Sequence, residues 1–192
     1  MTVAKKRIAV LLSGRGSNMR ALLEATKSPD YPAEIVLVVS DQIDAGGLDT
    51  ALAEDIASFA LIRDDFESKN AHEAAIIEVI ESAEIDLICL AGYMRLLSAT
   101  FTERFSGKLI NIHPSLLPLH KGLDTHRRAL EASDKEHGCT IHYVNAEMDG
   151  GTIIAQARVP VMEDDTPETL AARVLIEEHR LYPEVVKQLC SV

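Results

Sequence analysis

Short apolar runs alternate along the chain with longer segments in which apolar residues recur every three or four positions. The runs predict strands, and the spaced positions predict helices that pack against them. Strands are expected at residues 7–13, 34–40, 58–61, 86–91, 109–113, 139–144 and 153–159, and helices are expected to start near residues 17, 46, 68, 125 and 166. This alternation is typical of the α/β class with a single doubly wound, mostly parallel sheet, and we expect one domain over residues 1–192.

The strand at residues 109–113 carries two polar side chains near its end, Asn111 and His113. Residues two apart in a strand point to the same face, so an amide and an imidazole would lie together. Pro114 ends the strand because it lacks the N–H group that a central ladder needs. The pair is therefore expected at the carboxyl end of a strand, where open α/β sheets bind ligands. A strand end capped by polar side chains explains the same residues without a ligand.

A glycine turn with the sequence G-R-G-S-N separates the first strand from the first helix at residues 14–18. A helix that follows such a turn offers free N–H groups and a positive dipole to an anion, and Ser17 or Asn18 is expected to cap it. The dinucleotide fingerprint requires a third glycine where this chain has Met19, although Asp41 follows the second strand where a ribose-binding acid would lie. A single phosphate on a smaller ligand fits better, and a tight turn with no ligand is the simpler alternative.

Two carboxylates and one loop occupy positions that need an explanation. Asp149 precedes a glycine pair between two strands, where ordinary turn chemistry accounts for an acid. Glu178 lies on the buried stripe of the last helix, where an acid is costly unless an internal Arg or His, or a ligand hydroxyl, meets it.

In the same helix, Pro183 is expected to kink or restart the chain. The loop at residues 92–97 is more apolar than a solvent loop, which indicates a pocket wall or a loop covered by its neighbours.

The chain is acidic, with a formal net charge of −11, and 47% of its 192 residues are hydrophobic. Nucleic acid is not expected as a partner, because binding a phosphate backbone needs a basic face. Cys89, Cys139 and Cys190 follow no metal-binding or disulfide spacing, and no apolar run is long enough for a secretory signal core or a membrane span. We expect a cytoplasmic protein with reduced thiols, no metal and no membrane partner.

Six motifs along the chain occur in the order found in one enzyme family. They are S-G-R-G-S-N, A-G-Y-M-R-L-L, N-I-H-P-S-L-L-P, G-L-D-T-H, M-D-G-G and E-E-H-R-L-Y-P. Over about residues 8–186 the chain thus resembles the phosphoribosylglycinamide formyltransferases, folate-dependent enzymes of purine synthesis. The resemblance implies a Rossmann-like formyltransferase fold and transfer of a formyl group from the co-substrate 10-formyltetrahydrofolate to the primary amine of glycinamide ribonucleotide. The products would be formylglycinamide ribonucleotide and tetrahydrofolate, and the expected assembly is a monomer or homodimer.

The resemblance also implies a catalytic group, a ribonucleotide-binding group and a folate-binding group of residues. The catalytic residues would be Asn111, His113 and Asp149. The ribonucleotide would be bound at its phosphate by Gly16, Ser17 and Asn18, and at its ribose hydroxyls by Glu178. The folate would be bound by Lys69, Met94, Arg95, Leu96, Leu97 and Asn111.

The residue types in the catalytic group suit this reaction. Attack of an amine on a formyl carbon creates an oxyanion, to which Asn111 can donate a hydrogen bond. His113 is the natural carrier for the proton that leaves the amine, because imidazole titrates near neutral pH. Asp149 would favour the charged imidazole and orient a relaying water.

Two positions depart from the family pattern. Lys69 stands where the family often has Arg, which keeps a positive charge but loses the bidentate fork for a carboxylate. Asp124 stands where His is common in the motif G-L-H-T-H, whereas His126 is retained. No role for the Asp124 side chain beside Asp149 or the folate is therefore carried over from the family.

Three other functions share some of these features. Formyltetrahydrofolate hydrolase has the same Asn, His and Asp chemistry and is the main alternative, but it resembles this domain fused to an amino-terminal regulatory module, whereas the first strand here begins near Arg7. Methionyl-tRNA formyltransferase carries a carboxyl-terminal nucleic-acid-binding domain, whereas this chain is acidic and stops at Val192. A nucleotide-binding regulatory protein would leave the catalytic residues and Glu178 without a shared purpose. We therefore expect the transferase.

Overall fold

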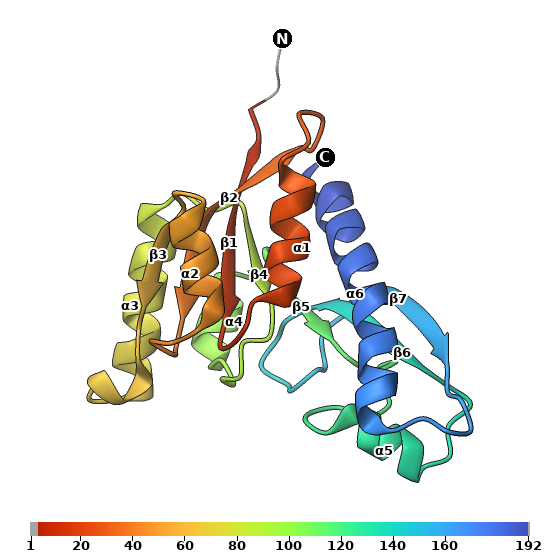
Figure 1. Ribbon diagram of the computed structural model, residues 1–192. Helices are drawn as coiled ribbons and strands as arrows, with labels where there is room; N and C mark the ends of the chain where they lie inside the picture. Colours follow the sequence, from red (N-terminus) through yellow and green to blue (C-terminus); the bar gives the residue numbers. More distant parts are fainter. Residues whose placement is uncertain (1–3, 192) are drawn as a thin grey trace.

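A sheet of seven strands is the framework of residues 4–191, the part of the chain that the structure, a computed structural model, describes (Figure 1). The strands are β1 (Lys6–Leu12), β2 (Ala33–Ser40), β3 (Ala57–Ala60), β4 (Leu87–Leu90), β5 (Leu109–His113), β6 (Glu136–Tyr143) and β7 (Ile153–Pro160). Their order across the sheet is β3-β2-β1-β4-β5-β6-β7. Neighbours from β3 to β5 run parallel, and β6 pairs antiparallel with both β5 and β7. The predicted doubly wound, mostly parallel sheet is confirmed.

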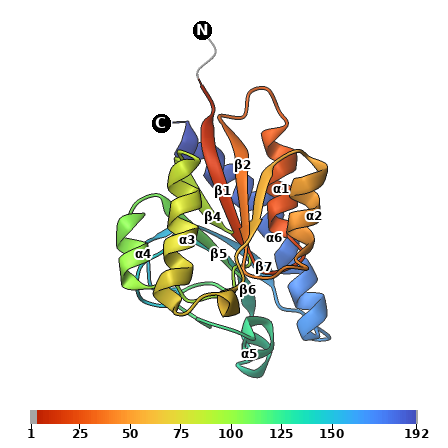
Figure 2. The ribbon, with the colours of Figure 1, turned by 90° about the vertical axis from the view of Figure 1, so that its left-hand side faces the viewer.

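Helices cover both faces of this sheet. They are α1 (Ser17–Thr26), α2 (Gly46–Ala53), α3 (Lys69–Ser82), α4 (Ala99–Arg104), α5 (Thr125–Glu131) and α6 (Pro167–Cys190), with a short 3-10 turn at Arg63–Asp65. Helices α1, α2 and α6 lie on one face, and α3 and α4 lie on the other (Figure 2). The sequence did not predict α4. Within residues 4–191, no helix combines the length and the apolar character needed to cross a membrane.

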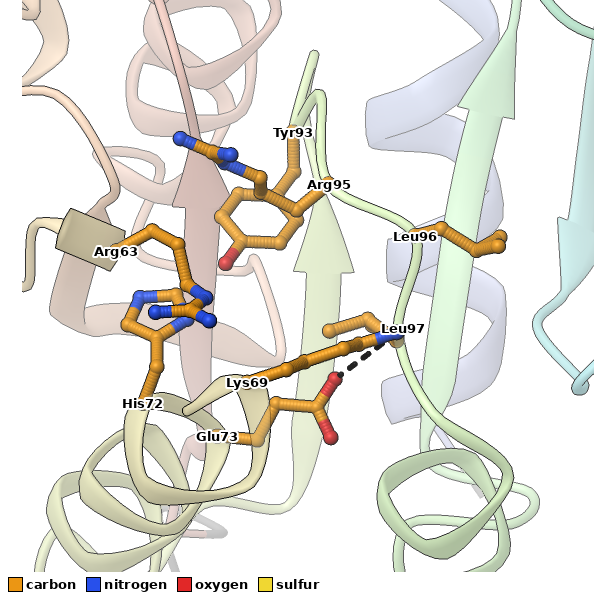
Figure 3. Close-up of a pocket in the computed structure, with 8 residues that line it drawn as sticks. All are labelled: Arg63, Lys69, His72, Glu73, Tyr93, Arg95, Leu96 and Leu97. Carbon is orange, nitrogen blue, oxygen red and sulfur yellow. Dashed lines mark ion pairs between the residues drawn. The ribbon is translucent and has the colours of Figure 1, made fainter. Parts of the chain in front are cut away.

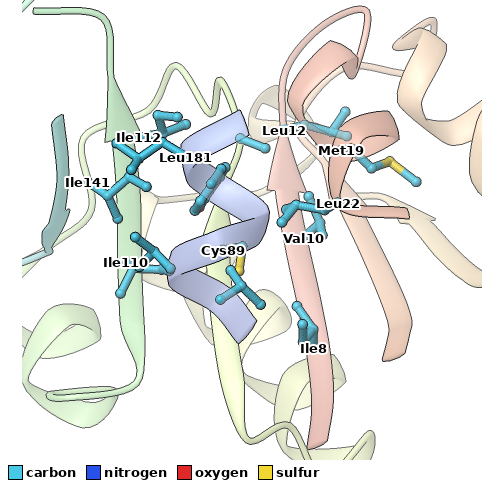
Figure 4. Packing of buried hydrophobic residues seen from close by; sticks show 14 of the residues in the cluster. Ile8, Val10, Leu12, Met19, Leu22, Cys89, Ile110, Ile112, Ile141 and Leu181 are labelled. Carbon is cyan, nitrogen blue, oxygen red and sulfur yellow. The ribbon is translucent and has the colours of Figure 1, made fainter. Parts of the chain in front are cut away.

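Strand β1 shows why its stretch over residues 8–12 contains no polar residue. Ile8, Val10 and Leu12 pack in the cluster that includes α1 and α6 (Figure 4), and Ala9 and Leu11 pack in the cluster on the α3 face. All five side chains are fully buried. Both faces of a parallel sheet are covered by helices, so an alternating apolar and polar pattern would place polar groups in a core.

A side chain caps the N-terminus of α6, but no side chain caps the N-terminus of α1. Thr166 caps α6 with Pro167 at the first helical position, as predicted. The predicted cap of α1 by Ser17 or Asn18 is wrong, because the residue before the helix is Gly16, with a φ of 72° and no side-chain cap. A Cβ on Gly16 would lie 2.9 Å from the Cα of Gly47, so the close approach of α1 and α2 requires a glycine there.

Of the two outcomes expected at Pro183, a kink or a restart, the restart is wrong, because helix α6 continues through the proline. The helix spans Pro167–Cys190 as one element. Beside the proline, Tyr182 is fully buried and donates to the carbonyl of Leu90 at 2.9 Å. Tyr31 donates to the carbonyl of Pro183 itself at 2.8 Å. These contacts hold the helix against the sheet although proline removes one backbone hydrogen bond.

Candidate active site

A pocket of about 650 Å³ opens at the carboxyl ends of β4 and β5, next to the point where the strand order reverses between β1 and β4. Open α/β sheets bind ligands at this place. Its walls come from the loop after β4, the end of β5, the loop that joins β6 to β7, and parts of α1 and α6. The structure brings nine of the predicted site residues into this lining: Asn18, Met94, Arg95, Leu96, Leu97, Asn111, His113, Asp149 and Glu178.

Asn111 on β5 lies directly opposite His142 on β6. The Nδ2 atom of Asn111 is 3.2 Å from Nε2 of His142, and Nδ1 of His142 is 2.9 Å from the carbonyl oxygen of Tyr143. A carbonyl oxygen only accepts, so Nδ1 carries the ring proton and Nε2 accepts from the amide. Burial lowers the pKa of His142, which favours this neutral ring. One N–H of Asn111 is thus held by His142, and the second is available to a ligand in the pocket.

His113 is oriented by the chain that follows it. Its Nε2 lies 3.1 Å from the carbonyl oxygen of His120, so Nε2 donates and Nδ1 is the acceptor of the neutral ring. Nδ1 lies 3.5 Å from Oδ2 of Asp149, and the His113 side chain is only 8% exposed. An imidazole held in this way can accept a proton at Nδ1 beside a carboxylate that stabilises the resulting charge.

Asp149 lies in the loop between β6 and β7, in the left-handed region with a φ of 49°. Its Oδ2 accepts from the backbone N–H of Gly122 at 2.8 Å, and its Oδ1 lies 3.7 Å from Nε2 of His142. A Cβ on Gly151 would lie 1.6 Å from the carbonyl oxygen of Tyr143, so the return of the chain to β7 requires a glycine there. Turn chemistry explains the glycine but not a carboxylate that is largely buried between two histidines.

Glu178 on α6 is 7% exposed, and its Oε2 accepts from Nδ2 of Asn18 at 2.7 Å. Burial raises the pKa of Glu178, and the hydrogen bond from Asn18 opposes that effect. In the described part of the chain, no Arg, Lys or His forms an ion pair with Glu178. The Oδ1 atom of Asn18 is also buried without a partner. The Glu178 carboxylate therefore lies in the pocket lining with Asn18 as its donor, an arrangement that leaves acceptor capacity for a ligand hydroxyl group.

Three of the predicted site residues lie outside this lining. Gly16 and Ser17 are at the N-terminus of α1, directly before Asn18. Lys69 lies at the start of α3, where its Nζ is 3.7 Å from Oε1 of Glu73 (Figure 3). It lines a smaller pocket of about 130 Å³ that shares part of its wall with the larger one. The shared residues are Tyr93, Arg95, Leu96 and Leu97.

Several residues that the sequence did not single out also line the larger pocket. His142 is the most informative, since it orients Asn111, but only the pairing of β5 with β6 reveals it. Leu123 and Met148 are apolar yet 75% and 51% exposed, and they lie on the side of Asp149. Asp124, already noted in the sequence as a departure from the motif, lines the pocket too, with its carboxylate 3.6 Å from Arg127. Across residues 4–191, no group of three or more His, Cys, Asp or Glu side chains is arranged to hold a metal ion.

Comparison with known proteins places the chain in a family. The formyl transferase family model matches residues 6–186. Phosphoribosylglycinamide formyltransferases of Haemophilus influenzae and Escherichia coli are 46% and 44% identical to the chain, over 95% and 93% of its length and 86% and 84% of theirs. The crystal structure of phosphoribosylglycinamide formyltransferase from Brucella melitensis matches with a TM-score of 0.94 and 53% identity, covering 98% of this chain and 97% of that one. By sequence, by fold and by the length matched, the chain belongs to the formyl transferase family.

Proposed function

We propose that the protein transfers the formyl group of 10-formyltetrahydrofolate to the primary amine of glycinamide ribonucleotide, giving formylglycinamide ribonucleotide and tetrahydrofolate. The observation that carries this proposal is the convergence of Asn111, His113 and Asp149 in one pocket. Formyl transfer between two nitrogens needs a donor for an oxyanion and a carrier for a proton. The identity of 44% and 46% to phosphoribosylglycinamide formyltransferases supports the choice of substrates.

The three residues divide the chemistry between them. The bound folate supplies the formyl carbon that the amine attacks. The second N–H of Asn111 donates to the developing oxyanion, a type of contact worth roughly 3–4 kcal/mol in acyl transfer. His113 accepts the proton of the attacking amine at Nδ1 and returns it to the leaving folate nitrogen. Asp149, 3.5 Å from that Nδ1, stabilises the imidazolium while it carries the proton.

The folate would lie along the apolar wall of the pocket. Met94, Arg95, Leu96 and Leu97 form this wall, and Met94 and Leu96 are exposed at 67% and 55%, as expected for side chains that a ligand covers. A volume of about 650 Å³ is within the range of roughly 300–1,000 Å³ for sites of this kind. Lys69, in the adjoining smaller pocket, would add a positive charge near the folate.

The ribonucleotide would lie between α1 and α6. Its ribose hydroxyls would donate to the carboxylate of Glu178, which Asn18 holds in the pocket lining. Its phosphate would bind the N-terminus of α1 at Gly16 and Ser17, where no side chain caps the helix. Uncapped N–H groups and the helix dipole attract an anion locally. A local attraction of this kind is needed because the net negative charge of the chain repels a phosphate group. The two substrates would meet at Asn111.

The compartment, the partners and the assembly of this enzyme are also part of the proposal. We propose a cytoplasmic enzyme, since all three cysteines are free and buried, as suits a reducing compartment. We also propose that its partners are the two small-molecule substrates, with neither nucleic acid nor a membrane, that it uses no metal, and that it acts as a monomer or homodimer.

A spectroscopic assay of 10-formyltetrahydrofolate consumption tests the proposal against the hydrolase alternative. Consumption that requires glycinamide ribonucleotide is expected, because the amine is the acceptor. Equal consumption without the ribonucleotide would make water the acceptor and favour the hydrolase. The Glu178 carboxylate in the pocket lining, hydrogen-bonded to Asn18, favours the transferase, since hydrolysis needs no ribose site.

A further inference from the structure

Asp41 follows β2 and is 1% exposed, yet it lines neither pocket. In a dinucleotide-binding fold, an acid at this position in the sequence binds a ribose. In this structure Asp41 instead forms hydrogen bonds with side chains of the same chain. Its Oδ2 accepts from Nε of Arg95 at 2.6 Å and from Nε2 of Gln42 at 3.2 Å. A buried carboxylate is costly unless it is paired, so the contact with Arg95 is the feature that explains this acid.

Arg95 belongs to the loop after β4 that forms the wall shared by both pockets. Its Nε carries a single hydrogen, so the bond to Asp41 fixes the direction in which the side chain leaves the loop. Figure 3 shows Arg95 and Leu96 leaving the loop on opposite sides. Anchoring Arg95 therefore sets the side on which Leu96 is presented.

The same loop is tied to the end of β1 through Ser13. The backbone N–H of Ser13 donates to the carbonyl of Gly92 at 3.0 Å, and Oγ of Ser13 accepts from the N–H of Met94 at 2.8 Å. Burial alone would raise the pKa of Asp41, but its hydrogen bonds, including that from Arg95, outweigh burial and hold it below its ordinary value of 3.8. Asp41 thus stays charged and is paired with the pocket wall through Arg95.

We infer that Asp41 is a positioning residue for the folate side of the site, which holds Arg95 and so keeps residues 92–97 in the conformation that presents Met94 and Leu96 to the formyl donor. The inference rests on the proposed function, because the formyl donor is the ligand that this wall would contact. Asp41 acts through Arg95 and touches no substrate. Its loss should therefore weaken binding of the donor more than it slows the chemical step.

The variant Asp41→Asn tests this with the least disturbance. Asparagine keeps the size and one acceptor oxygen but loses the charge, and charge-assisted hydrogen bonds are about twice as strong as neutral ones. The KM for 10-formyltetrahydrofolate should rise about fivefold, while kcat and the KM for the ribonucleotide change by less than about twofold. The matched control is Asp44→Asn, an exposed acid in the same loop, which should change none of these constants. Equal rises in both Michaelis constants, or no rise, would overturn the inference.

A double-mutant cycle with Arg95→Leu separates positioning from general stability. If Asp41 acts through Arg95, Asp41→Asn should have little further effect on the donor KM in the Arg95→Leu protein. The same fold-change in both backgrounds would mean that Asp41 acts without Arg95 and would overturn the inference. If Asp41→Asn proves unstable at the assay temperature, Arg95→Lys provides the second test, because lysine keeps the charge but not the Nε geometry. It should give the same selective rise in the donor KM, and an unchanged donor KM would again contradict the inference.

Calorimetric binding of tetrahydrofolate separates this inference from the proposed function. If the proposed function is wrong, the parent protein should consume 10-formyltetrahydrofolate at the same rate with and without the ribonucleotide. Failure of the inference would appear only in the ratio of the dissociation constants of Asp41→Asn and the parent. A ratio near one would overturn the role of Asp41 whichever acceptor the enzyme uses.

Discussion

Replacing Glu178 by Gln should stabilise the protein and weaken its binding of the ribonucleotide. Glu178 is 7% exposed and receives one hydrogen bond, from Asn18 at 2.7 Å. A glutamine keeps an acceptor for Asn18 and removes the buried charge. A buried polar group with unmet hydrogen bonds costs about 1–3 kcal/mol, and a charged group costs more, so exchanging the carboxylate for a neutral amide should gain about 1 kcal/mol. For a chain of this size, 1 kcal/mol raises Tm by about 2–4 °C.

The stabilisation should depend on pH in a defined direction. Burial raises the pKa of Glu178 in the folded protein above its ordinary value of 4.5. Below pH 4.5 the carboxyl is protonated in the folded and unfolded states alike, so parent and Glu178→Gln should melt at similar temperatures. As the pH rises through the raised pKa, the parent loses this stability because the unfolded chain releases its proton more readily. The difference in Tm should therefore grow as the pH rises above 4.5 and level off once Glu178 is ionised in the folded protein as well.

The effect on binding has the opposite sign. A carboxylate that accepts from ribose hydroxyls contributes about 1.5–3 kcal/mol, so the KM for the ribonucleotide should rise roughly 10- to 150-fold with little change in kcat. Thermal unfolding across this pH range and steady-state kinetics measure both effects. Glu177→Gln is the control, since Glu177 pairs with Arg180 outside the pocket and should show neither effect. A lower Tm at pH 7 would give Glu178 a structural role, and an unchanged KM would refute its contact with ribose.

Three further substitutions test two catalytic residues and the loop that carries the third, Asp149. His113→Gln should lower kcat about 100-fold or more. A loss of only a few fold in kcat, measured by steady-state kinetics, would rule out proton transfer by His113. Asn111→Ala should lower kcat roughly 100- to 1,000-fold with a smaller change in the ribonucleotide KM, and an effect confined to KM would contradict the oxyanion role. Gly151→Ala should lower the free energy of unfolding by about 1–3 kcal/mol in denaturant titrations and also reduce kcat, because its Cβ would lie 1.6 Å from the carbonyl oxygen of Tyr143 and displace the loop of Asp149. Unchanged stability in that variant would show that the loop can relax.

Features that depend on the periodicity of one element could be predicted from the sequence. Alternation along β5 places Asn111 and His113 on one face, and both line the pocket. The three- and four-residue spacing of α6 places Glu178 inward, where it is buried. The apolar character of residues 92–97 indicates a wall, and this loop lines both pockets. Each of these signals needs only local geometry.

Features that depend on the meeting of distant elements could not be predicted in this way. His142 orients Asn111 from 31 residues away, and Asp41 holds Arg95 from 54 residues away. The first contact depends on the register of β5 and β6, and the second on how one loop lies over another. The wrong prediction of a side-chain cap for α1 has the same origin, since the start of α1 is set by the close approach of Gly16 to Gly47. Tertiary contacts of Tyr182 likewise decide that α6 continues through its proline.

The fate of the formyl carbon tests the central claim most directly. 10-Formyltetrahydrofolate labelled with carbon-13 in the formyl group, incubated with the protein and glycinamide ribonucleotide, can be followed by NMR. We predict that the label appears in the amide of formylglycinamide ribonucleotide, at a rate that falls about 100-fold or more in His113→Gln. Label that accumulates as free formate, at the same rate with and without the ribonucleotide, would contradict formyl transfer to the amine.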